Sequence, residues 1–432
     1  MSKRALKLLG LGTALVLALA VAGLISGAEG LAAQSCTVTV SPGESIQQAI
    51  DAAPWGAVIC LGEGTWKENI WIRKSLTIRG AGAGKTVIRS ALLDLPVVWI
   101  QGDEIEVVLE GVTITGAFGF RSGPPIGLRA TGSARVSLTN SRVSGNGWSG
   151  LWVWDSTKLR LQASEVSGNG RYGLEVGGSA RVEVRESRFL DNAVAGIAVW
   201  SEKARVEGTP NEMRGNGVDL LGYAPPSLRK PLVPQTDRTQ LSVPGDYVTI
   251  QEAVDAVAPG GTITIGEGTY IGGITLWKPV TLRGAGREAT ILQTQEGQDL
   301  VISIPASVQG VRLEKLAVRG SERDGLLIYG QAHLEELQVS DNGTGLDVRG
   351  SAQVSLQDST VSRNRWSGLV MWGSARASIQ RSLIEGNGTA DGWKKEWHCS
   401  GIVVEDKAHV DHDPEQPRLG HRRLSWEVRV LD

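Results

Sequence analysis

The sequence predicts an all-β protein, a parallel β-helix solenoid that occurs as two tandem copies. Three observations carry this prediction: a strict short repeat, apolar alternation inside each repeat, and a duplication of the whole pattern. The repeat is clearest between residues 127 and 202, where runs that begin with glycine recur every 23 residues, at Gly127, Gly150, Gly173 and Gly196. A strict period of this length is typical of a solenoid.

Each repeat contains a short strand in which apolar residues alternate with variable ones. Leu151 and Val153 return one period later as Leu174 and Val176. This alternation puts an apolar face inside and the intervening residues outside. A 23-residue unit with two or three strands has no room for a helix, so we expect each unit to be one coil that buries its face on its neighbours.

Asparagines close successive coils in this part of the chain. They lie at Asn146, Asn169, Asn192 and Asn216. Asparagine tolerates turn geometry, and its amide can hydrogen-bond to the equivalent residue of the next coil. We therefore expect a structural asparagine ladder.

The N-terminal segment, residues 1–33, is typical of a secretory signal peptide. Basic residues between positions 3 and 7 precede an apolar run over residues 8–25, and small residues follow. An uncleaved anchor is the alternative, because the run approaches the length that spans a membrane. We predict that the protein is secreted, periplasmic or on the cell surface, with no other membrane contact.

Export permits disulfide bonds, and two of the three cysteines lie on strand-like runs that should be neighbours in the first coil. These runs are Cys36-Thr-Val-Thr-Val and Ala57-Val-Ile-Cys60-Leu. We predict that Cys36 and Cys60 pair. Cys399 is then left free.

The duplication begins with a short amphipathic helix. Ser45-Ile-Gln-Gln-Ala-Ile-Asp-Ala-Ala returns 204 residues later as Thr249-Ile-Gln-Glu-Ala-Val-Asp-Ala-Val. Ser45 with Gln48, and Thr249 with Glu252, are predicted to form capping boxes. We expect each helix to cover the open end of its own β-helix, where unpaired strand edges invite aggregation.

Proline-rich sequence separates the two copies. Four prolines and no alternation over residues 222–240 predict a semi-rigid linker. The predicted domains are residues 36–221 and residues 241–432, and both lie within the usual domain size.

The duplicated start of the second copy resembles a known group of proteins. The helix Thr249-Ile-Gln-Glu-Ala-Val-Asp-Ala-Val, then Ile-Thr-Ile-Gly-Glu-Gly-Thr-Tyr270 and Leu282-Arg-Gly-Ala-Gly, resembles the start of the pectin-lyase-like superfamily. The resemblance implies a right-handed parallel β-helix over nearly all of the mature chain. It also implies that a polysaccharide substrate lies in a groove along one parallel sheet. The matching residues belong to the scaffold, so the resemblance does not identify an activity.

The variable strand positions are the candidates for such a groove. In the first copy they include Arg129, Trp152, Trp154, Glu175 and Trp200. Stacked strands lie about 4.8 Å apart, so Arg129, Trp152 and Glu175 should form one column. Indole rings beside charged groups suit sugars. The alternative is that these tryptophans fill space against a loop or against the other domain.

The second copy aligns less fully with this pattern. Its candidates are Asp347, Arg349 and Trp372, with an insertion over residues 389–400 that contains Trp393 and Trp397. An insertion in a solenoid maps to a loop on one face, often the binding face. A simple surface excursion is the alternative.

Catalysis has the least support in the sequence. Glycosidases usually use two carboxylates, whereas the first-copy face offers only Glu175. Glu175 and Arg129 are the catalytic candidates, and an enzyme of this kind would be a polysaccharide lyase, an epimerase or a glycoside hydrolase. We expect no cofactor and no metal, because His409 falls at an ordinary outward strand position in a late cluster of histidines.

The sequence thus favours a secreted or cell-envelope protein that binds polysaccharide, or binds and processes it, along an exposed tryptophan-rich strand face. A formal net charge of -2 gives no basic surplus for nucleic acid. The alternative is a non-enzymatic structural or adhesive surface protein.

Overall fold

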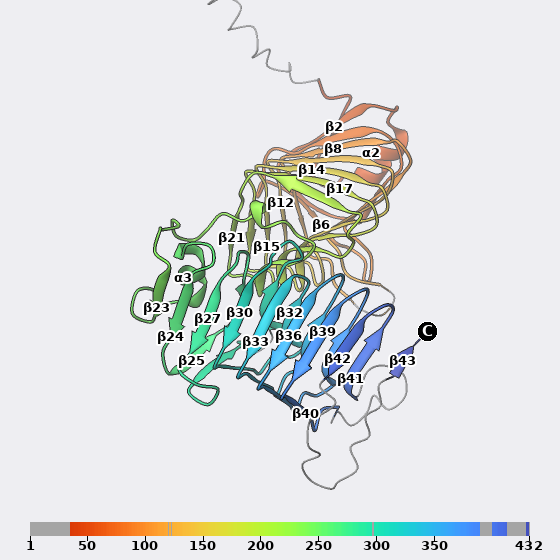
Figure 1. Cartoon of the computed structure of the whole chain (residues 1–432). Coiled ribbons are helices and arrows are strands. Elements are labelled where there is room, and N and C mark those ends of the chain that lie inside the picture. The colour runs from red at the N-terminus through yellow and green to blue at the C-terminus, as the bar shows by residue number, and fades with distance from the viewer. Residues whose placement is uncertain are drawn as a thin grey trace, which may run out of the picture.

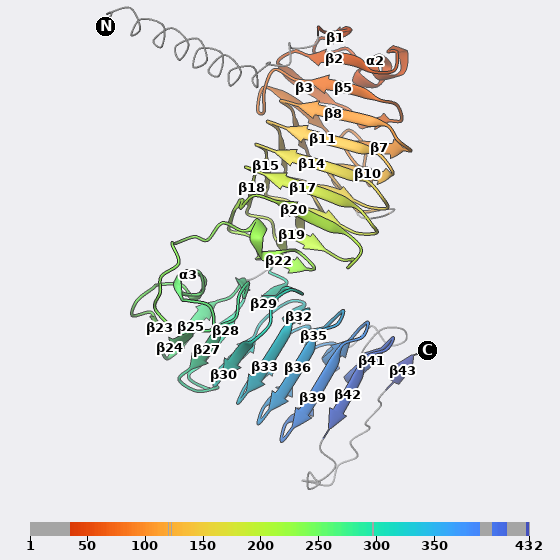
Figure 2. The same cartoon turned by 45° about the horizontal axis from the view of Figure 1, so that its top comes forward.

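The chain forms two stacks of β-strand coils that run in different directions and meet near the middle of the sequence (Figures 1 and 2). The computed structural model describes residues 35–119, 121, 123–295, 298–388, 400–412 and 429–431. The predicted signal peptide, Cys399 and the insertion up to residue 399 lie outside these residues. No helix in the described part of the chain is long and apolar enough to cross a membrane.

Three parallel sheets form the walls of the first stack, and each takes one strand from successive coils. One contains β1 (Val38–Val40), β2 (Ala57–Leu61), β5 (Leu76–Arg79), β8 (Glu106–Glu110), β11 (Arg135–Thr139), β14 (Lys158–Gln162), β17 (Arg181–Arg185) and β20 (Arg205–Gly208). The second contains β3 (Gly64–Lys67), β6 (Thr86–Arg89), β9 (Thr113–Thr115), β12 (Arg142–Ser144), β15 (Glu165–Ser167), β18 (Arg188–Leu190) and β21 (Glu212–Arg214). The third, called the β4–β22 sheet, contains β4 (Ile70–Ile72), β7 (Val98–Gly102), β10 (Leu128–Gly132), β13 (Leu151–Val153), β16 (Tyr172–Val176), β19 (Ala195–Val199) and β22 (Val218–Gly222).

The second stack repeats this plan. Its first sheet contains β23 (Gln240–Val243), β24 (Thr262–Ile265), β27 (Thr281–Gly284), β30 (Val311–Glu314), β33 (Gln331–Glu335), β36 (Gln353–Gln357), β39 (Arg376–Gln380) and β42 (His409–His412). Its second contains β25 (Gly268–Ile271), β28 (Thr290–Gln293), β31 (Ala317–Arg319), β34 (Gln338–Ser340), β37 (Thr360–Ser362) and β40 (Leu383–Glu385). The third, called the β26–β43 sheet, contains β26 (Ile274–Thr275), β29 (Leu300–Ile304), β32 (Asp324–Ile328), β35 (Thr344–Val348), β38 (Ser367–Met371), β41 (Ser400–Glu405) and β43 (Arg429–Leu431). The predicted all-β solenoid is confirmed.

Strict register between coils builds the core. The same inward position is apolar in coil after coil, so buried side chains stack in columns along each stack. One such column runs Ile59, Ile78, Leu109, Leu138, Leu161 and Val184. Burying each of these side chains contributes about 1.5–3 kcal/mol relative to leaving it exposed.

The predicted asparagine ladder is confirmed. Asn146 Nδ2 donates to Asn169 Oδ1 (3.0 Å), Asn169 to Asn192 (2.9 Å), and Asn192 to Asn216 (2.9 Å). All four side chains are buried. The ladder ends where Asn216 Nδ2 donates to Asp219 Oδ1 at 3.2 Å, at the junction of the two stacks.

Both predicted helices are present, as α2 (Ile46–Ala52) and α3 (Ile250–Ala256). The capping box of α3 is complete, with Thr249 and Glu252 bonding reciprocally. The box predicted for α2 is wrong in its second half.

Ser45 accepts from the amide of Gln48, but Glu68, not Gln48, binds the remaining donors at this end of α2. Glu68 accepts from Ser45 Oγ (2.6 Å) and from the amides of Ile46 (2.9 Å) and Gln47 (3.2 Å). A carboxylate suits a helix N-terminus better than an amide does. The role of the helices as caps on the stack ends stays a prediction.

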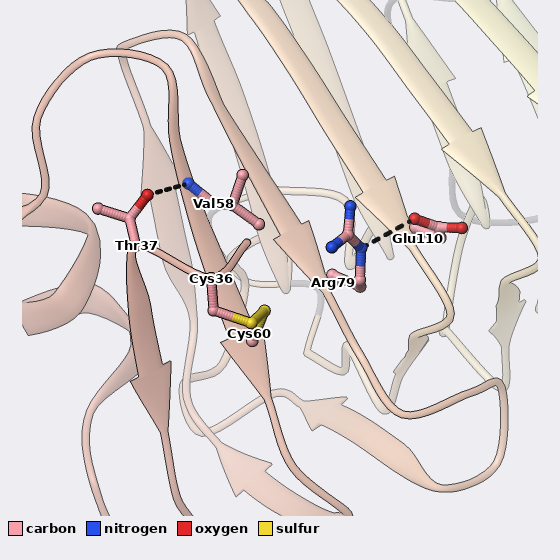
Figure 3. The surroundings of a disulfide bond; sticks show 6 residues. All are labelled: Cys36, Thr37, Val58, Cys60, Arg79 and Glu110. Carbon is pink, nitrogen blue, oxygen red and sulfur yellow. Dashed lines mark hydrogen bonds and ion pairs between the residues drawn. A yellow bond between two sulfur atoms is a disulfide. The ribbon is translucent and has the colours of Figure 1, made fainter. Parts of the chain in front are cut away.

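The predicted disulfide is confirmed at the start of the first stack (Figure 3). Cys36 and Cys60 are joined with a Cα–Cα distance of 5.7 Å. Beside the disulfide, the amide of Val58 donates to Thr37 Oγ1 at 3.0 Å. The bond therefore ties the first described residues to β2.

The open edge of the last strand of the first stack is satisfied by the second stack. The amide of Asp219 in β22 donates to Thr275 Oγ1 (2.9 Å), and Ser303 Oγ donates to the carbonyl of Leu220 (2.8 Å). The amide of Ala306 donates to the carbonyl of Gly222 (3.0 Å). The end of the first stack thus abuts the outward side of β26 and β29.

Residues 222–240 contact both stacks. They contain a 3-10 helix, Pro226–Leu228, and Leu228 belongs to the core of the first stack. Arg229 is buried, and it pairs with Asp219 of the first stack and with Asp255 of α3. The two stacks have separate cores, while their division into domains 36–221 and 241–432, with a linker between, stays a prediction.

A third apolar cluster joins the stacks. It is built from buried residues of both stacks that do not belong to the two main cores. Its buried members are Tyr172, Val194, Ala195, Ala198, Val218, Leu221, Leu300, Leu327 and Tyr329. The outward face predicted to bind ligand is therefore an internal contact near the junction.

Replacing Arg229 with alanine should destabilise the protein. It leaves the Asp219 and Asp255 carboxylates buried without their cation, which typically costs about 3–5 kcal/mol. Arg238→Ala is the matched control, because it removes an exposed pair with Asp246, worth about 0–1 kcal/mol. Denaturant unfolding measures both, and equal losses for the two variants would contradict the junction's dependence on Arg229.

Candidate functional site

The outward positions of the β4–β22 sheet form a continuous column of side chains. Strand register places Trp71, Trp99, Arg129, Trp152, Glu175, Ala198 and Leu221 on successive strands. The predicted column of Arg129, Trp152 and Glu175 is therefore confirmed. Trp71 and Trp99 extend it toward α2, and all three tryptophans are partly exposed.

Arg129 lies between two indole rings. Its Cζ is 4.9 Å from the ring centroid of Trp99 and 4.5 Å from that of Trp152. Within the described residues it has no ion pair and no hydrogen bond, and its Nε is buried without a partner. Burial lowers the pKa of Arg129, and the charge of Asp155 partly opposes this. The column thus contains a half-buried cation held by aromatic rings alone.

Trp152 and Trp154 form a stacked pair at the centre of this face. Their ring centroids are 4.7 Å apart and their planes differ by 9°. The ring of Trp154 lies over the next strand, where a Cβ at Gly177 would come within 2.3 Å of Trp154 Cζ2. Glycine at position 177 is what lets this indole lie flat on the sheet.

Glu175 is buried and engaged by neighbouring donors. Ser149 Oγ donates to its Oε2 (2.6 Å), and Trp200 Nε1 donates to its Oε1 (3.0 Å). Burial raises the pKa of Glu175, while hydrogen bonds from Ser149, Trp200 and Trp148 oppose the rise. Trp152 separates Glu175 from Arg129 in the column. The two catalytic candidates are thus on one face but not adjacent, and a catalytic role for either stays a prediction.

In the second stack, Asp347 and Arg349 bind each other. Arg349 Nε and Nη2 donate to the two carboxylate oxygens of Asp347 at 2.9 and 2.5 Å. The guanidinium carbon of Arg349 is 5.9 Å from the ring centroid of Trp200 and 6.0 Å from that of Trp372. The structure therefore brings Trp200 of the first stack together with three candidates of the second.

A pocket of about 650 Å³ lies where the two outward faces meet. The first stack lines it with Asp155, Gly178, Ser179, Trp200, Ser201, Glu202, Lys203 and Tyr223, and the second with Gly350, Gly373 and Ser374. The faces of the two copies thus share one corner, a point that the sequence left open.

Two acidic groups, the half-buried Asp299 and the buried Asp324, lie near Arg171. Asp299 contacts Arg171 at 3.3 Å, and burial raises the pKa of Asp299. Asp324 is buried, and burial together with the charge of Asp347 raises its pKa well above the usual range. In the described part of the chain, no group of three or more His, Cys, Asp or Glu is arranged to hold a metal ion.

Trp71 and Trp99 were not predicted as part of this column, although the sequence contains a signal for them. Ile70-Trp71-Ile72 and Val98-Trp99-Ile100 have the same apolar-Trp-apolar pattern as Leu151-Trp152-Val153. Longer loops before β7 and β10 break the 23-residue period there. Trp393, Trp397 and His398 of the insertion lie outside the described residues.

The model of a right-handed β-helix region matches residues 86–225 and 302–411, more than half of the chain. The chain belongs to this family. The expected right-handed parallel β-helix is therefore confirmed. No curated protein sequence matches the chain.

Several solved structures align with the chain at low similarity. The A-module of the mannuronan C-5 epimerase AlgE6 of Azotobacter vinelandii is 15% identical, with 86% of this chain and 95% of that chain covered and a TM-score of 0.37. A family 28 exopolygalacturonase of Yersinia enterocolitica is 10% identical, with 88% and 79% covered and a TM-score of 0.38. A pectin methylesterase of Aspergillus niger is 13% identical, with 88% and 85% covered and a TM-score of 0.30. These TM-scores are too low to carry an argument about function.

Asp324→Asn should change how stability depends on pH. The raised pKa of Asp324 means that its protonated form favours folding, so its contribution is full below the unfolded pKa of about 4 and is lost as pH rises. Relative to the wild type, the variant should therefore gain stability as pH rises toward 7. The gain is limited to about 1.4 kcal/mol per pH unit for one proton.

The control for this experiment is Asp358→Asn. Asp358 is in an exposed ion pair with Arg381, which lowers the pKa of Asp358. Its contribution is lost only as pH falls below about 4, so this variant should show no gain between pH 5 and 7. Denaturant unfolding at several pH values measures both, and parallel profiles for Asp324→Asn and wild type would contradict the assignment.

Proposed function

We propose that this protein binds polysaccharide across the strands of the β4–β22 sheet. One observation carries the proposal: Arg129 is held between Trp99 and Trp152, without a carboxylate partner, in a column of partly exposed side chains. Among the described residues, most other arginines pair with a carboxylate, as Arg79, Arg135 and Arg188 do. A guanidinium left with free donors at a partly exposed face is available to a ligand.

The geometry of the column suits a linear ligand. Its side chains come from successive coils, about 4.8 Å apart, so a chain that follows the axis of the stack meets each in turn. Indole rings contribute apolar area and an N–H donor, and Arg129 contributes donors for hydroxyl or acidic groups. The tryptophans are partly buried, so the contact is made by ring edges and partly covered faces.

An extracellular or periplasmic location agrees with the disulfide between Cys36 and Cys60, since such bonds persist in oxidising compartments. The proposal contains no catalytic step. Glu175 is surrounded by donors that hold it in place, and Trp152 lies between it and Arg129. Glu175 therefore serves best as the acceptor that positions Trp200.

A structural role is the second candidate. The observation that favours it is the apolar cluster at the junction, which uses the same outward face for contact between the stacks. In that case the tryptophans stiffen a bent rod, and the face contacts protein. Self-association without dependence on glycan would then be the main property of the molecule.

Trp152→Ala and Trp154→Ala should each weaken polysaccharide binding by about threefold to tenfold, because each removes aromatic contact area. Titration calorimetry against polygalacturonate, alginate, xylan and glucomannan measures this. Trp366→Ala is the matched control, as a partly exposed tryptophan of the second stack outside the column. No binding by the unmodified protein, or equal losses for all three variants, would overturn the proposal.

The same incubations test for catalysis. Reducing ends and unsaturated products are measured in parallel with binding. Binding without product supports a binding protein. Product formation that is abolished by Glu175→Gln would instead establish an enzyme.

A further inference from the structure

The duplication allows the region beside α2 to be compared with its equivalent beside α3. The scaffold is the same in both. Gln47 Nε2 donates to the carbonyl of Trp71 (3.2 Å), and its Oε1 accepts from the Trp71 amide (2.7 Å). Gln251 makes the same two bonds to Thr275, at 3.3 and 2.8 Å. Differences between the two regions therefore concern what fills the space beside the helix.

Beside α3, the chain itself fills this space. Asp255 is fully buried and accepts from Arg229 Nη1 (2.6 Å), from the amide of Leu232 (2.7 Å) and from Trp277 Nε1 (2.8 Å). Arg229 and Leu232 both belong to the segment that joins the stacks. The space beside α3 is thus filled by residues of the chain itself.

Beside α2, the equivalent space is an open pocket of about 470 Å³. It is lined by Gln47, Ile50, Asp51, Trp55, Trp71, Arg73 and Lys74. Asp51 stands where Asp255 stands in the second copy, but it is exposed. Within the described residues its carboxylate accepts one hydrogen bond, from Gln47 Nε2 at 2.9 Å. The Asp255 carboxylate of the second copy is fully hydrogen-bonded, whereas the equivalent Asp51 carboxylate of the first copy is available to a ligand.

Three lining positions differ between the copies in a consistent way. Trp55 stands in place of Pro259, Trp71 in place of Thr275, and Arg73 in place of Trp277. Trp55 is 68% exposed, an unusual position for so large an apolar ring. The pocket beside α2 therefore has two indole rings and a cation that are absent from the equivalent positions beside α3. It lacks the indole of Trp277, which donates a hydrogen bond to Asp255 in the second copy.

We propose that this pocket is a sugar-binding subsite at the α2 end of the column. Trp71 belongs to both the pocket and the column, so the two are continuous. The indoles provide area for a sugar ring, Asp51 accepts from sugar hydroxyls, and Arg73 donates to them. This inference rests on the proposed function and extends it by naming where the bound chain ends.

An arginine side chain, which fills the space beside α3, does not suit the pocket beside α2. An arginine such as Arg229 would meet Arg73 in the open pocket, where the second copy has the uncharged Trp277, and like charges at close range disfavour that contact. A sugar carries no such charge and can use donors and acceptors together. A peptide ligand therefore becomes an alternative outcome of the test.

The decisive variant is Trp55→Ala, compared with Trp152→Ala. Because Trp55 is largely exposed, its removal should leave the thermal midpoint unchanged. Trp71 and Trp152 are three strands apart, about 14 Å at the usual spacing, so a long chain reaches both sites and a short one does not. Trp55→Ala should weaken binding of the long polysaccharide by about threefold to tenfold, and Trp55→Tyr should restore part of it.

The measurement uses intact polygalacturonate, alginate, xylan and glucomannan, and disaccharides and long oligosaccharides prepared from whichever of them binds. The loss in Trp55→Ala should grow with chain length. Unchanged binding of the long chain in Trp55→Ala, with a loss in Trp152→Ala, would overturn the subsite and leave the proposed function standing. Absence of binding by the unmodified protein would overturn both.

A peptide arm completes the test. A synthetic peptide with the sequence of residues 223–234 contains the arginine that fills the second copy's site. Binding of this peptide that requires Trp55, with no effect of Trp55→Ala on any polysaccharide, would overturn the sugar assignment. No peptide binding, together with the chain-length effect, is the expected result.

Discussion

In-register parallel stacking is the constraint on which the rest of this molecule depends. Each coil hydrogen-bonds to the next, and equivalent residues therefore fall in columns, inside and outside alike. A slip of one residue would turn every apolar side chain of a strand outward. The same register that stacks Ile59, Ile78 and Leu109 in the core also stacks Trp99, Arg129 and Trp152 outside. The same strand register thus positions both the core side chains and the residues of the candidate site.

A stack built this way has open ends, and the chain closes one of them with its own second copy. The last strand of the first stack exposes backbone groups that cannot be left unpaired when buried. Thr275 and Ser303, outward residues of the second stack, satisfy two of them. Arg229 then neutralises carboxylates on both sides. The bend of the molecule follows, because the end of one stack rests on the side of the other (Figure 2).

The repeating coils could be predicted from the sequence more fully than the junction between the stacks. Period and alternation predicted the coils, the asparagine ladder and the pairing of Cys36 with Cys60, since each depends on neighbours one coil apart. The two helices were predicted from their local amphipathic pattern and their N-cap residues. The junction depends on contacts between residues far apart in sequence, such as Ser303 with Leu220, which no local pattern encodes. For the same reason the column of Arg129, Trp152 and Glu175 was predicted correctly, but the two residues that extend it were not. Trp71 and Trp99 were missed where loops disturb the period, and the burial of Glu175 follows from Ser149 and Trp200, which lie on other coils.

Duplication gives two copies of one scaffold that have diverged mainly where the scaffold does not constrain them. Gln47 and Gln251 keep the same backbone bonds, and Lys74 and Lys278 keep their bonds to the carbonyls at the end of each helix. The outward positions beside them differ between the copies, as Trp71 and Arg73 stand where Thr275 and Trp277 stand. One copy buries Asp255 under the joining segment, whereas in the other Asp51 is exposed in a pocket that Trp55 and Trp71 also line. Because fold stability makes no demand on an exposed Trp55, its presence beside an open acceptor is better explained by a ligand than by the scaffold.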